Sequence, residues 1–307
     1  MNCLMGRFAA WRSVALIAVL GCLHNPTMSQ AGWLRAWGDN RFGQCDVPPG
    51  DDFVAVAATG HTGMALRDDA SVVFWGEDYD GYFQEIWTGN DFVTIASGGM
   101  FGAIKRDGSL FSTGGYVPAG NDFVDIAVSG HGLALREDGS LVGWGRNGFH
   151  QAEVPAGNDF AAVAAGLDSS MVLKHDGSIV RWGDGGDWSS GPEFAAIAAQ
   201  WGNKLGLRKD GSLKSWGLDE QAPEGNDFAA IACGWYHSLA IRTDGSLVAW
   251  GGSNGSGQLD VPPGNNFVDI AAGIYHSVAI EVPEPSTLAA LLTMAATVAL
   301  IAWWRRR

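Results

Sequence analysis

The chain is poor in cysteine and in basic side chains. Only four cysteines occur among 307 residues, and Cys3 and Cys22 fall within the first 31 residues. Cys45 and Cys233 alone are too few for a disulfide scaffold. Cys233 replaces an alanine of a repeated strand and is expected to be a small buried thiol. With 19 Lys and Arg against 33 Asp and Glu, the net charge is −14, which repels phosphate backbones and excludes nucleic acid as an expected partner.

A helical period is also missing. Between residues 32 and 281, no segment combines a 3.6-residue apolar period with helix caps. A repeat is present instead, with the consensus Gly-Asn-Asp-Phe-Val-x-Ile-Ala-Ala-Gly-x-x-His-Ser-Leu-Ala-Leu-Arg-x-Asp-Gly-Ser-Leu-Val-x-Trp-Gly. Its phenylalanine recurs every 31 to 39 residues, a period typical of propellers and solenoids, at Phe53, Phe92, Phe123, Phe160, Phe194, Phe228 and Phe267. Its Trp-Gly pair recurs at Trp37, Trp75, Trp144, Trp182, Trp216 and Trp250.

Each unit is predicted to form short β-strands, so the fold class is all-β. Phe-Val-x-Ile-Ala is rich in β-formers, and two further β-rich runs, Ser-Leu-Ala-Leu-Arg and Ser-Leu-Val-x-Trp, flank an Asp-Gly turn. Asp-Gly favours a type I′ turn, which needs positive φ at both central residues. In the first unit the turn reads Asp69-Ala70-Ser71, so Ala70 is expected to be strained or to mark a different turn.

The two ends of the repeat region complement each other. The last unit runs from Phe267 to Ile280 and lacks the Asp-Gly-Ser hairpin, while an orphan strand, Trp33 to Gly38, has the missing sequence. Joining the two gives seven complete units and removes the exposed sheet edges that a linear array would leave. The sequence therefore predicts a seven-bladed β-propeller over residues 32–281, closed by the N-terminal strand.

The repeat resembles that of the regulator of chromosome condensation family. Segments 131–145 and 234–251 carry Gly-x-x-His-Ser-Leu-Ala-Leu and Asp-Gly-Ser-Leu-Val-x-Trp-Gly in whole or in large part, and residues 251–259 are similar to that family's inter-blade loop. The resemblance implies a propeller with seven blades. Units near 35 residues are shorter than is usual in that family, so blades of three full strands and a stub are expected. The nucleotide-exchange and chromatin roles of the eukaryotic namesake are not carried over, because fold does not determine function.

The N-terminus has the pattern of a secretory signal peptide. Arg7 and Arg12 precede an apolar run, and Ser29-Gln30-Ala31 places small residues for cleavage after Ala31. Residues 1–31 are therefore assigned to a signal peptide, whose two basic residues and no acidic one move the net charge to about −16 on removal. Lipidation at Cys22 is the alternative, because the preceding residues loosely resemble a lipoprotein cleavage box.

The C-terminus, residues 282–307, closely resembles a PEP-CTERM sorting signal of Gram-negative bacteria. Pro283, Glu284 and Pro285 precede an apolar run over residues 288–304, and three arginines follow: Arg305, Arg306 and Arg307. The run is close to the length of a membrane span, and the positive-inside rule keeps the arginines cytoplasmic. The resemblance implies an exosortase partner, transient inner-membrane anchoring, and release to the cell surface or extracellular matrix. An ordinary tail anchor is the alternative.

Repeated polar residues are expected to be structural. His131, His237 and His276 occupy one repeat position, where other units have Ser169 and Asn203, and a hydrogen bond at a strand start is the favoured role. The hairpin aspartates are interpreted as turn residues, since Asp-Gly-Ser lacks the order of a sialidase Asp box. Six basic residues stand two places before these aspartates and are expected either to pair locally or to form an anion-docking face: Arg67, Lys105, Arg136, Lys174, Arg208 and Arg242.

The opposite face is predicted to bind a ligand. Its turns and linkers hold aromatic residues among acids and asparagines, a composition suited to sugar stacking or protein anchoring. The candidate residues are Tyr79, Tyr82, Trp87, Trp188, Trp201, Trp235, Tyr236 and Tyr275. Packing between blades is the alternative for half or more of them. Residues 78–81 and 184–187 have some calcium ligands but not a full loop, so no metal site and no cofactor is predicted.

The resulting functional hypothesis is a secreted, surface-sorted, non-catalytic binding or scaffolding module. Its expected partner is an envelope protein or a matrix exopolysaccharide. The alternative is a carbohydrate-active enzyme with two linker carboxylates over the central channel, about 5–9 Å apart. A purely structural surface component is the third possibility.

Overall fold

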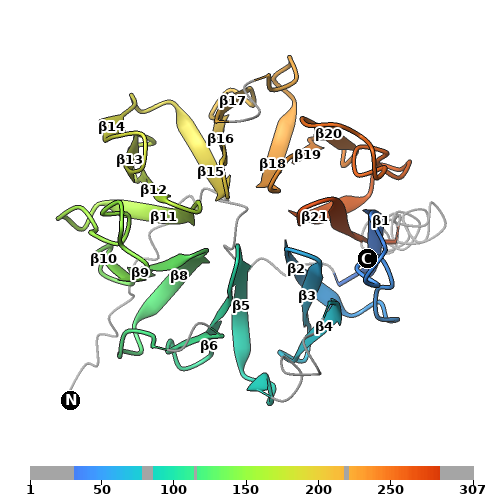
Figure 1. The fold of residues 1–307 in the computed structure, drawn as a ribbon, viewed down its shortest axis with the longest axis horizontal. Coiled ribbons are helices and arrows are strands. Elements are labelled where there is room, and N and C mark those ends of the chain that lie inside the picture. Colours follow the sequence, from blue (N-terminus) through green and yellow to red (C-terminus); the bar gives the residue numbers. More distant parts are fainter. Residues whose placement is uncertain (1–30, 78–85, 114–115, 218–220, 284–307) are drawn as a thin grey trace, which may run out of the picture.

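Seven small antiparallel sheets form a ring in the computed structural model (Figure 1). The structure describes residues 31–77, 86–113, 116–217 and 221–283. Each sheet is one blade, numbered here by the order of its inner strand along the chain. No helix in this described part is long and apolar enough to cross a membrane. The predicted signal peptide up to Gln30 and the predicted apolar span at 288–304 lie outside it.

The blades share one order of strands. The inner strands, which begin at the repeated phenylalanine, are β2 (Phe53–Thr59), β5 (Phe92–Ser97), β8 (Phe123–Val128), β11 (Phe160–Ala165), β15 (Phe194–Gln200), β18 (Phe228–Cys233) and β21 (Phe267–Ala272). The middle strands are β3 (Thr62–Arg67), β6 (Phe101–Lys105), β9 (His131–Arg136), β12 (Ser169–Lys174), β16 (Asn203–Arg208), β19 (Ser238–Arg242) and β22 (His276–Glu281). The outer strands are β4 (Val72–Gly76), β7 (Leu110–Ser112), β10 (Leu141–Gly145), β13 (Ile179–Gly183), β17 (Leu213–Trp216), β20 (Leu247–Trp250) and β1 (Trp33–Gly38). Within the described residues, only blade 4 adds a fourth strand, β14 (Trp188–Ser189).

The predicted closure of the ring is confirmed. Blade 7 has the order β1-β22-β21, and the register pairs Trp33 with Glu281 and Gly38 with His276. In Figure 1 the blue strand β1 accordingly lies beside the red C-terminal blade. Gly32 adds a bridge to Phe53 of blade 1, with N–H···O distances of 3.0 and 3.2 Å. Residues 32–282 therefore hold every strand of the ring, and both of its ends lie side by side.

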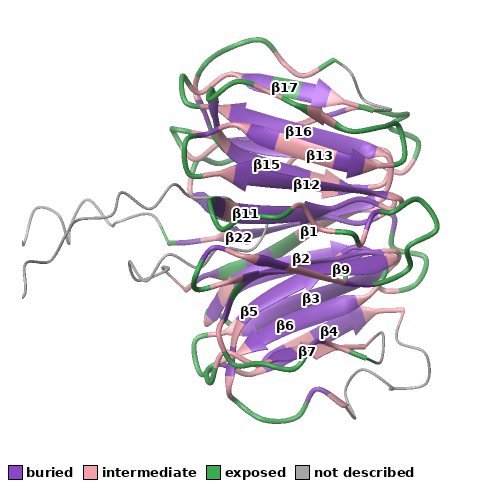
Figure 2. Cartoon of the chain, turned by 90° about the vertical axis from the view of Figure 1, so that its left-hand side faces the viewer, coloured by how far each residue is buried: buried purple, intermediate pink, exposed green. Residues whose placement is uncertain are grey.

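The strands run across the thickness of the ring, so the connections between them lie on its two faces (Figure 2). Turns between inner and middle strands, together with the Trp-Gly ends of the outer strands, define the turn face. Turns between middle and outer strands define the hairpin face, where Phe53 lies opposite Arg67. Because Trp33 pairs with Glu281 at the same edge, both ends of the closed ring leave from the hairpin face.

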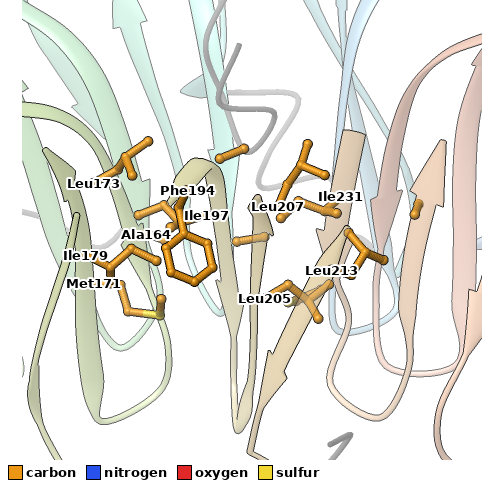
Figure 3. Close-up of a cluster of buried hydrophobic side chains, with 14 of the residues drawn as sticks. Ala164, Met171, Leu173, Ile179, Phe194, Ile197, Leu205, Leu207, Leu213 and Ile231 are labelled. Carbon is orange, nitrogen blue, oxygen red and sulfur yellow. The ribbon is translucent and has the colours of Figure 1, made fainter. Parts of the chain in front are cut away.

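Apolar side chains fill the space between neighbouring blades. The repeated phenylalanines are 0 to 3% exposed, since each begins an inner strand where two blades meet. Figure 3 shows one such cluster, in which Phe194 and Ile197 of blade 5 lie between Met171 of blade 4 and Ile231 of blade 6. Burying a side chain of this size stabilises a fold by roughly 2 kcal/mol. A period set by phenylalanine therefore fixes where blades join.

The predicted type I′ hairpin is wrong. In blade 2, the N–H of Gly108 donates to the carbonyl of Lys105 at 2.8 Å, and the N–H of Lys105 donates to Ser109 at 2.9 Å. Gly108 has φ of 81°, whereas Asp107 does not have positive φ. This is a three-residue loop that ends in a left-handed glycine. An Asp-Gly pair occurs both in two-residue type I′ loops and in three-residue loops that end in glycine. The sequence alone therefore did not distinguish the two loop lengths.

Ala70 holds the left-handed position of the first hairpin, as the sequence suggested. Its φ is 68°, and its hydrogen bonds follow the pattern of the glycine hairpins. A left-handed alanine costs about 1 kcal/mol, partly offset by the greater freedom that glycine has in the unfolded chain. We therefore expect Ala70→Gly to raise the free energy of unfolding by up to about 1 kcal/mol, measured by urea denaturation.

The converse substitution supplies the control for Ala70. A Cβ at Gly108 would lie 2.2 Å from the carbonyl oxygen of Asn121, so Gly108→Ala is expected to destabilise by more than about 1 kcal/mol. Equal stability of the Ala70→Gly variant and the unmodified chain would contradict the strain assigned to Ala70.

Candidate functional site

Four aromatic side chains form a continuous strip on the turn face, across blades 5, 6 and 7. Trp201 stacks on Trp235 with ring centroids 5.3 Å apart and planes 3° apart. Trp201 also meets Tyr236 edge-on at 5.2 Å, and Tyr236 stacks on Tyr275 at 5.4 Å. All four side chains are half-buried. This aromatic strip joins turns that lie 34 to 74 residues apart in the sequence.

Backbone hydrogen bonds between neighbouring turns hold the strip in place. Leu167 donates to the carbonyl of Trp201 at 3.0 Å, and Trp235 donates to the carbonyl of Gly273 at 3.1 Å. Trp201 has φ of 48°, an outlier for a bulky residue that is maintained only where the surroundings demand it. The indole Nε1 of Trp235 is buried and has no acceptor among the described residues. The strip is thus ordered before any ligand arrives, which lowers the entropy cost of binding.

An ion pair borders the strip at blade 7. Arg41 donates twice to Asp39, from Nε at 2.9 Å and from Nη2 at 2.9 Å. The hydrogen bond from Arg41 lowers the pKa of Asp39 below its usual value. The N–H of Asp39 donates to the carbonyl of Tyr275 at 2.8 Å, which fixes this pair beside the end of the strip. The border is therefore polar, as in many protein interfaces.

Gln200 spans the central channel at the turn face. Its Nε2 donates to the carbonyl of Ala58 at 3.1 Å, a contact from blade 5 to blade 1. The hydroxyl of Ser97 donates to the same carbonyl at 2.9 Å, and Gln200 is 5% exposed. The channel mouth is occupied by protein side chains here, so the surface offered to a ligand on this face is the strip rather than the channel.

The predicted ligand-binding residues fall into four groups. Trp201, Trp235, Tyr236 and Tyr275 come together in the strip. Trp188 lies apart, at the rim of blade 4. Trp87 is 4% exposed and packs in the core against Phe74, Phe92 and Phe111, so it is not part of a surface. Tyr79 and Tyr82 lie outside the described residues.

A groove with a volume of about 640 Å³ runs along the rim of blade 4. The linker after β10 supplies Phe149 and His150, β13 and β14 supply Arg181 and Trp188, and the turn between them supplies Asp187. In the segment 184–187, a possible calcium loop by sequence, the carbonyls of Asp184 and Gly185 accept hydrogen bonds from Arg181. No cluster of metal-ligating side chains occurs among the residues that the structure describes.

The six cations of the hairpin face are paired, but not with the hairpin aspartates. Their partners are the acids just before the repeated phenylalanine: Arg67–Asp52, Lys105–Asp91, Arg136–Asp122, Lys174–Asp159, Arg208–Glu193 and Arg242–Asp227. Sequence analysis missed these partners, although the consensus Asn-Asp-Phe carried the signal. Each cation also lies over that phenylalanine ring. Local pairing therefore accounts for this ring of charges.

All three repeated histidines are buried, and two of them form hydrogen bonds between blades. Nε2 of His131 lies 2.7 Å from the hydroxyl of Ser170, and Nε2 of His237 lies 2.8 Å from that of Ser277. Gly63 holds the position in blade 1 that corresponds to Ser170 and Ser277, and neither ring nitrogen of His276 has a partner in the described part of the chain. The structural role expected for His131 and His237 is therefore the one observed.

Buried histidines make stability depend on pH. Burial lowers the pKa of His276 to about 3, from 6.5. A depressed histidine contributes stability that is present above the unfolded pKa and is lost as pH falls towards the folded value. We expect the chain to lose about 2 kcal/mol through His276 between pH 7 and pH 5.

The variant His276→Asn, which copies Asn203 of blade 5, isolates this effect. Burial raises the pKa of Asp125 and Asp269, so those groups act in the opposite direction, but they are unchanged in the variant. Urea denaturation at pH 5 and pH 7 should show a smaller loss of stability for His276→Asn than for the unmodified chain. The same pH dependence in both proteins would contradict the prediction.

The geometry agrees with known structures of one class. A model described as the regulator of chromosome condensation (RCC1) repeat matches residues 127–151 and 228–258. Prp20p from Saccharomyces cerevisiae is similar over 88% of this chain and 96% of its own, with 16% identity and a TM-score of 0.69. Human WBSCR16 is similar over 81% and 98%, with 15% identity and a TM-score of 0.66. The ectodomain of the Arabidopsis thaliana receptor kinase ACR4 is similar over 76% and 92%, with 19% identity and a TM-score of 0.60.

Together, repeat and fold define the class: the chain is an RCC1-like repeat β-propeller. At 15 to 19% identity the solved structures show the fold alone, and no curated protein matches the chain. What the propeller binds must therefore be argued from its own surface.

Proposed function

We propose that this propeller is a non-catalytic binding module that contacts its partner through the aromatic strip. The observation that carries the proposal is the array of four half-buried rings, continuous across three blades and held by backbone hydrogen bonds. Tryptophan and tyrosine dominate the energetics of protein interfaces, because they bury much apolar area at low conformational cost. The polar border at Asp39 and Arg41 completes the pattern of an apolar centre with a polar rim.

The partner that we favour is a protein of the cell envelope. Prp20p, which shares the fold, has binding properties to Gsp1p and histones. Two rings of the strip, those of Trp201 and Trp235, cover one another's faces. The edges and outer faces of these two rings remain for contact. This arrangement suits packing against side chains of a protein partner more than stacking against a flat sugar ring. A matrix polysaccharide is the other outcome that the test distinguishes.

The test is capture from envelope and matrix extract with purified residues 32–283, before and after protease treatment of the extract. A protein partner is lost after proteolysis, whereas capture that survives proteolysis and yields to competing sugar indicates a polysaccharide. The double variant Trp201→Ala and Tyr236→Ala should reduce capture at least about tenfold. Tyr116→Ala, at a tyrosine that is 78% exposed and outside the strip, is the matched control. Full capture by the double variant would refute the assignment of the strip.

The proposal also includes export and surface sorting. The described chain ends beside Pro283 on the hairpin face, while Glu284, Pro285 and Arg305 to Arg307 lie outside the described residues. If residues 288–304 enter the membrane, the hairpin face lies toward it and the aromatic strip points away, toward the exterior. Replacing Pro283-Glu284-Pro285 by alanines is expected to trap the protein in the inner membrane. Normal release of that variant would contradict exosortase sorting.

A further inference from the structure

We propose that the groove on the rim of blade 4 is a second binding site, specific for an uncharged pyranose sugar. It is separate from the aromatic strip. Its walls are the linker after β10 and the hairpin of β13 and β14, the latter being the fourth strand seen in no other described blade (Figure 1). Its volume of about 640 Å³ lies within the range of small-molecule sites, roughly 300–1,000 Å³.

One wall of the groove is built around a tryptophan. Trp188 pairs with Arg181 across β13 and β14 and rests against Trp216 of blade 5 at 5.3 Å. Arg181 also binds the carbonyls of Asp184 and Gly185, which shapes the turn into β14. The indole of Trp188 is half-buried and lines the groove. A fixed indole with one open side is suited to stacking against the C–H face of a pyranose ring.

The opposite wall carries a residue that local structure disfavours. Three linkers share the pattern of an asparagine that binds an acid six residues later, with Gln44, Gln151 and Gln258 between them. Before the glutamine, two linkers have glycine, Gly43 and Gly257, with φ of 76° and 78°. The third has His150, with φ of 61°. A side chain retained in a strained conformation points to a function, and this side chain lines the groove.

A second change in the same linker serves this histidine. Glu153 stands where the other two linkers have Asp46 and Asp260. Its longer side chain accepts from Asn147 at 3.0 Å and also reaches Nδ1 of His150 at 2.8 Å. The imidazole is thereby oriented with Nε2 left for a ligand, and Nε2 can donate or accept according to protonation. Both departures from the linker pattern thus fall at the groove.

Charge decides the class of sugar. The groove holds two carboxylates, of Glu153 and Asp187, together with the guanidinium of Arg181 and the imidazole of His150. Nη1 and Nη2 of Arg181 donate to the carbonyls of Gly185 and Asp184, and the hydrogen bond to Glu153 raises the pKa of His150. The whole chain carries a net charge of −14. The groove therefore has no excess of positive charge to attract a uronate, and the net charge of the chain repels one, while the hydroxyls of a neutral sugar donate to the carboxylates. An uncharged hexose unit matches both the indole and the acceptors.

The test uses purified residues 32–283, which contain every strand of the ring, and follows tryptophan fluorescence. The probes are uncharged glucose, mannose and galactose oligosaccharides of different linkage, together with an oligogalacturonate. Saturable binding of at least one neutral probe, with none for the oligogalacturonate, is the expected result. Trp188→Ala should weaken that binding by about tenfold or more.

His150→Gly is the sharper variant, because it installs the residue of the two sister linkers. It removes the imidazole without the risk of unfolding and is also expected to weaken binding about tenfold. Tyr116→Ala, at an exposed tyrosine outside both the strip and the groove, should leave sugar binding unchanged. Capture through the strip is measured separately with the Trp201→Ala and Tyr236→Ala double variant, so failure here is distinguishable from failure of the proposed function. Absence of saturable binding to every neutral probe would overturn the proposal, as would binding that His150→Gly leaves intact.

Discussion

Deleting Gly32 to Gly38 is expected to unfold the propeller or lower its stability by more than about 4 kcal/mol. This segment contains β1, the outer strand of the C-terminal blade. It buries Leu34 to 5% exposure, and the indole of Trp37 donates to Gln258 at 2.9 Å. Without it, β22 loses its whole ladder with β1 and becomes an exposed edge strand, which invites aggregation.

A circular permutant provides the control for this deletion. Connecting Glu281 to Trp33 through the Thr-Asp-Gly turn that joins Arg242 to Ser246 in blade 6 restores a continuous blade 7. New ends are placed in the linker between blades 5 and 6. The permutant should unfold cooperatively with nearly the stability of the unmodified ring, whereas the deletion should not. Urea denaturation and size-exclusion chromatography check both. A deletion variant as stable as the intact ring would contradict closure by both chain ends.

Asp269→Asn is expected to destabilise the ring by about 2–3 kcal/mol, because one half-buried carboxylate joins two blades. Oδ2 of Asp269 accepts from the N–H of Val56 in blade 1 at 2.9 Å, and Oδ1 accepts from Ile270 at 3.0 Å. Burial raises the pKa of Asp269 to about 7, and the two backbone donors oppose that shift. An asparagine has one carbonyl oxygen, so its amide group would face an N–H donor.

The same arrangement recurs between blades 3 and 4. Asp125 is 1% exposed and accepts from Ile126 at 2.9 Å and from Val163 at 3.0 Å. Because the two junctions share no partner, the losses in Asp125→Asn and Asp269→Asn should add in the double variant. Asp51→Asn, at an exposed carboxylate, is the matched control. Urea denaturation at pH 8 measures all four proteins. A change below about 0.5 kcal/mol in Asp269→Asn would show that the bridge contributes little.

The ring and its closure were predictable because they rest on periodic burial. A phenylalanine that begins every inner strand, and a missing hairpin supplied by residues 33–38, leave few arrangements that cover every sheet edge. The hairpin type was not predictable from Asp-Gly alone, since the same pair occurs in two loop lengths. Similarly, each basic residue of the hairpin face has acidic residues before and after it in the sequence. Only the strand register shows that Arg67 forms its ion pair with Asp52.

The candidate surface was predictable only in part. Spacing places Trp201, Trp235 and Tyr275 in equivalent turns, and equivalent turns meet on one face of a closed ring. The spacing of the repeat does not show whether a linker side chain packs into the core. For this reason Trp87 was assigned to the surface, although it lies in the core. Gln200 reaches Ala58 of blade 1 from blade 5. A contact of this kind depends on the distance between blades, which sequence patterns within one unit do not reveal. His150 was not predicted as a site residue, although its alignment with Gly43 and Gly257 was the available signal.

Hydrogen exchange of the propeller, free and with its captured partner bound, directly tests whether the partner binds through the aromatic strip. We expect slower exchange in the turns around Trp201, Trp235 and Tyr275, with the hairpins around Asp107 and Asp244 unchanged. Protection confined to those hairpins, with the aromatic turns unaffected, would contradict binding through the strip.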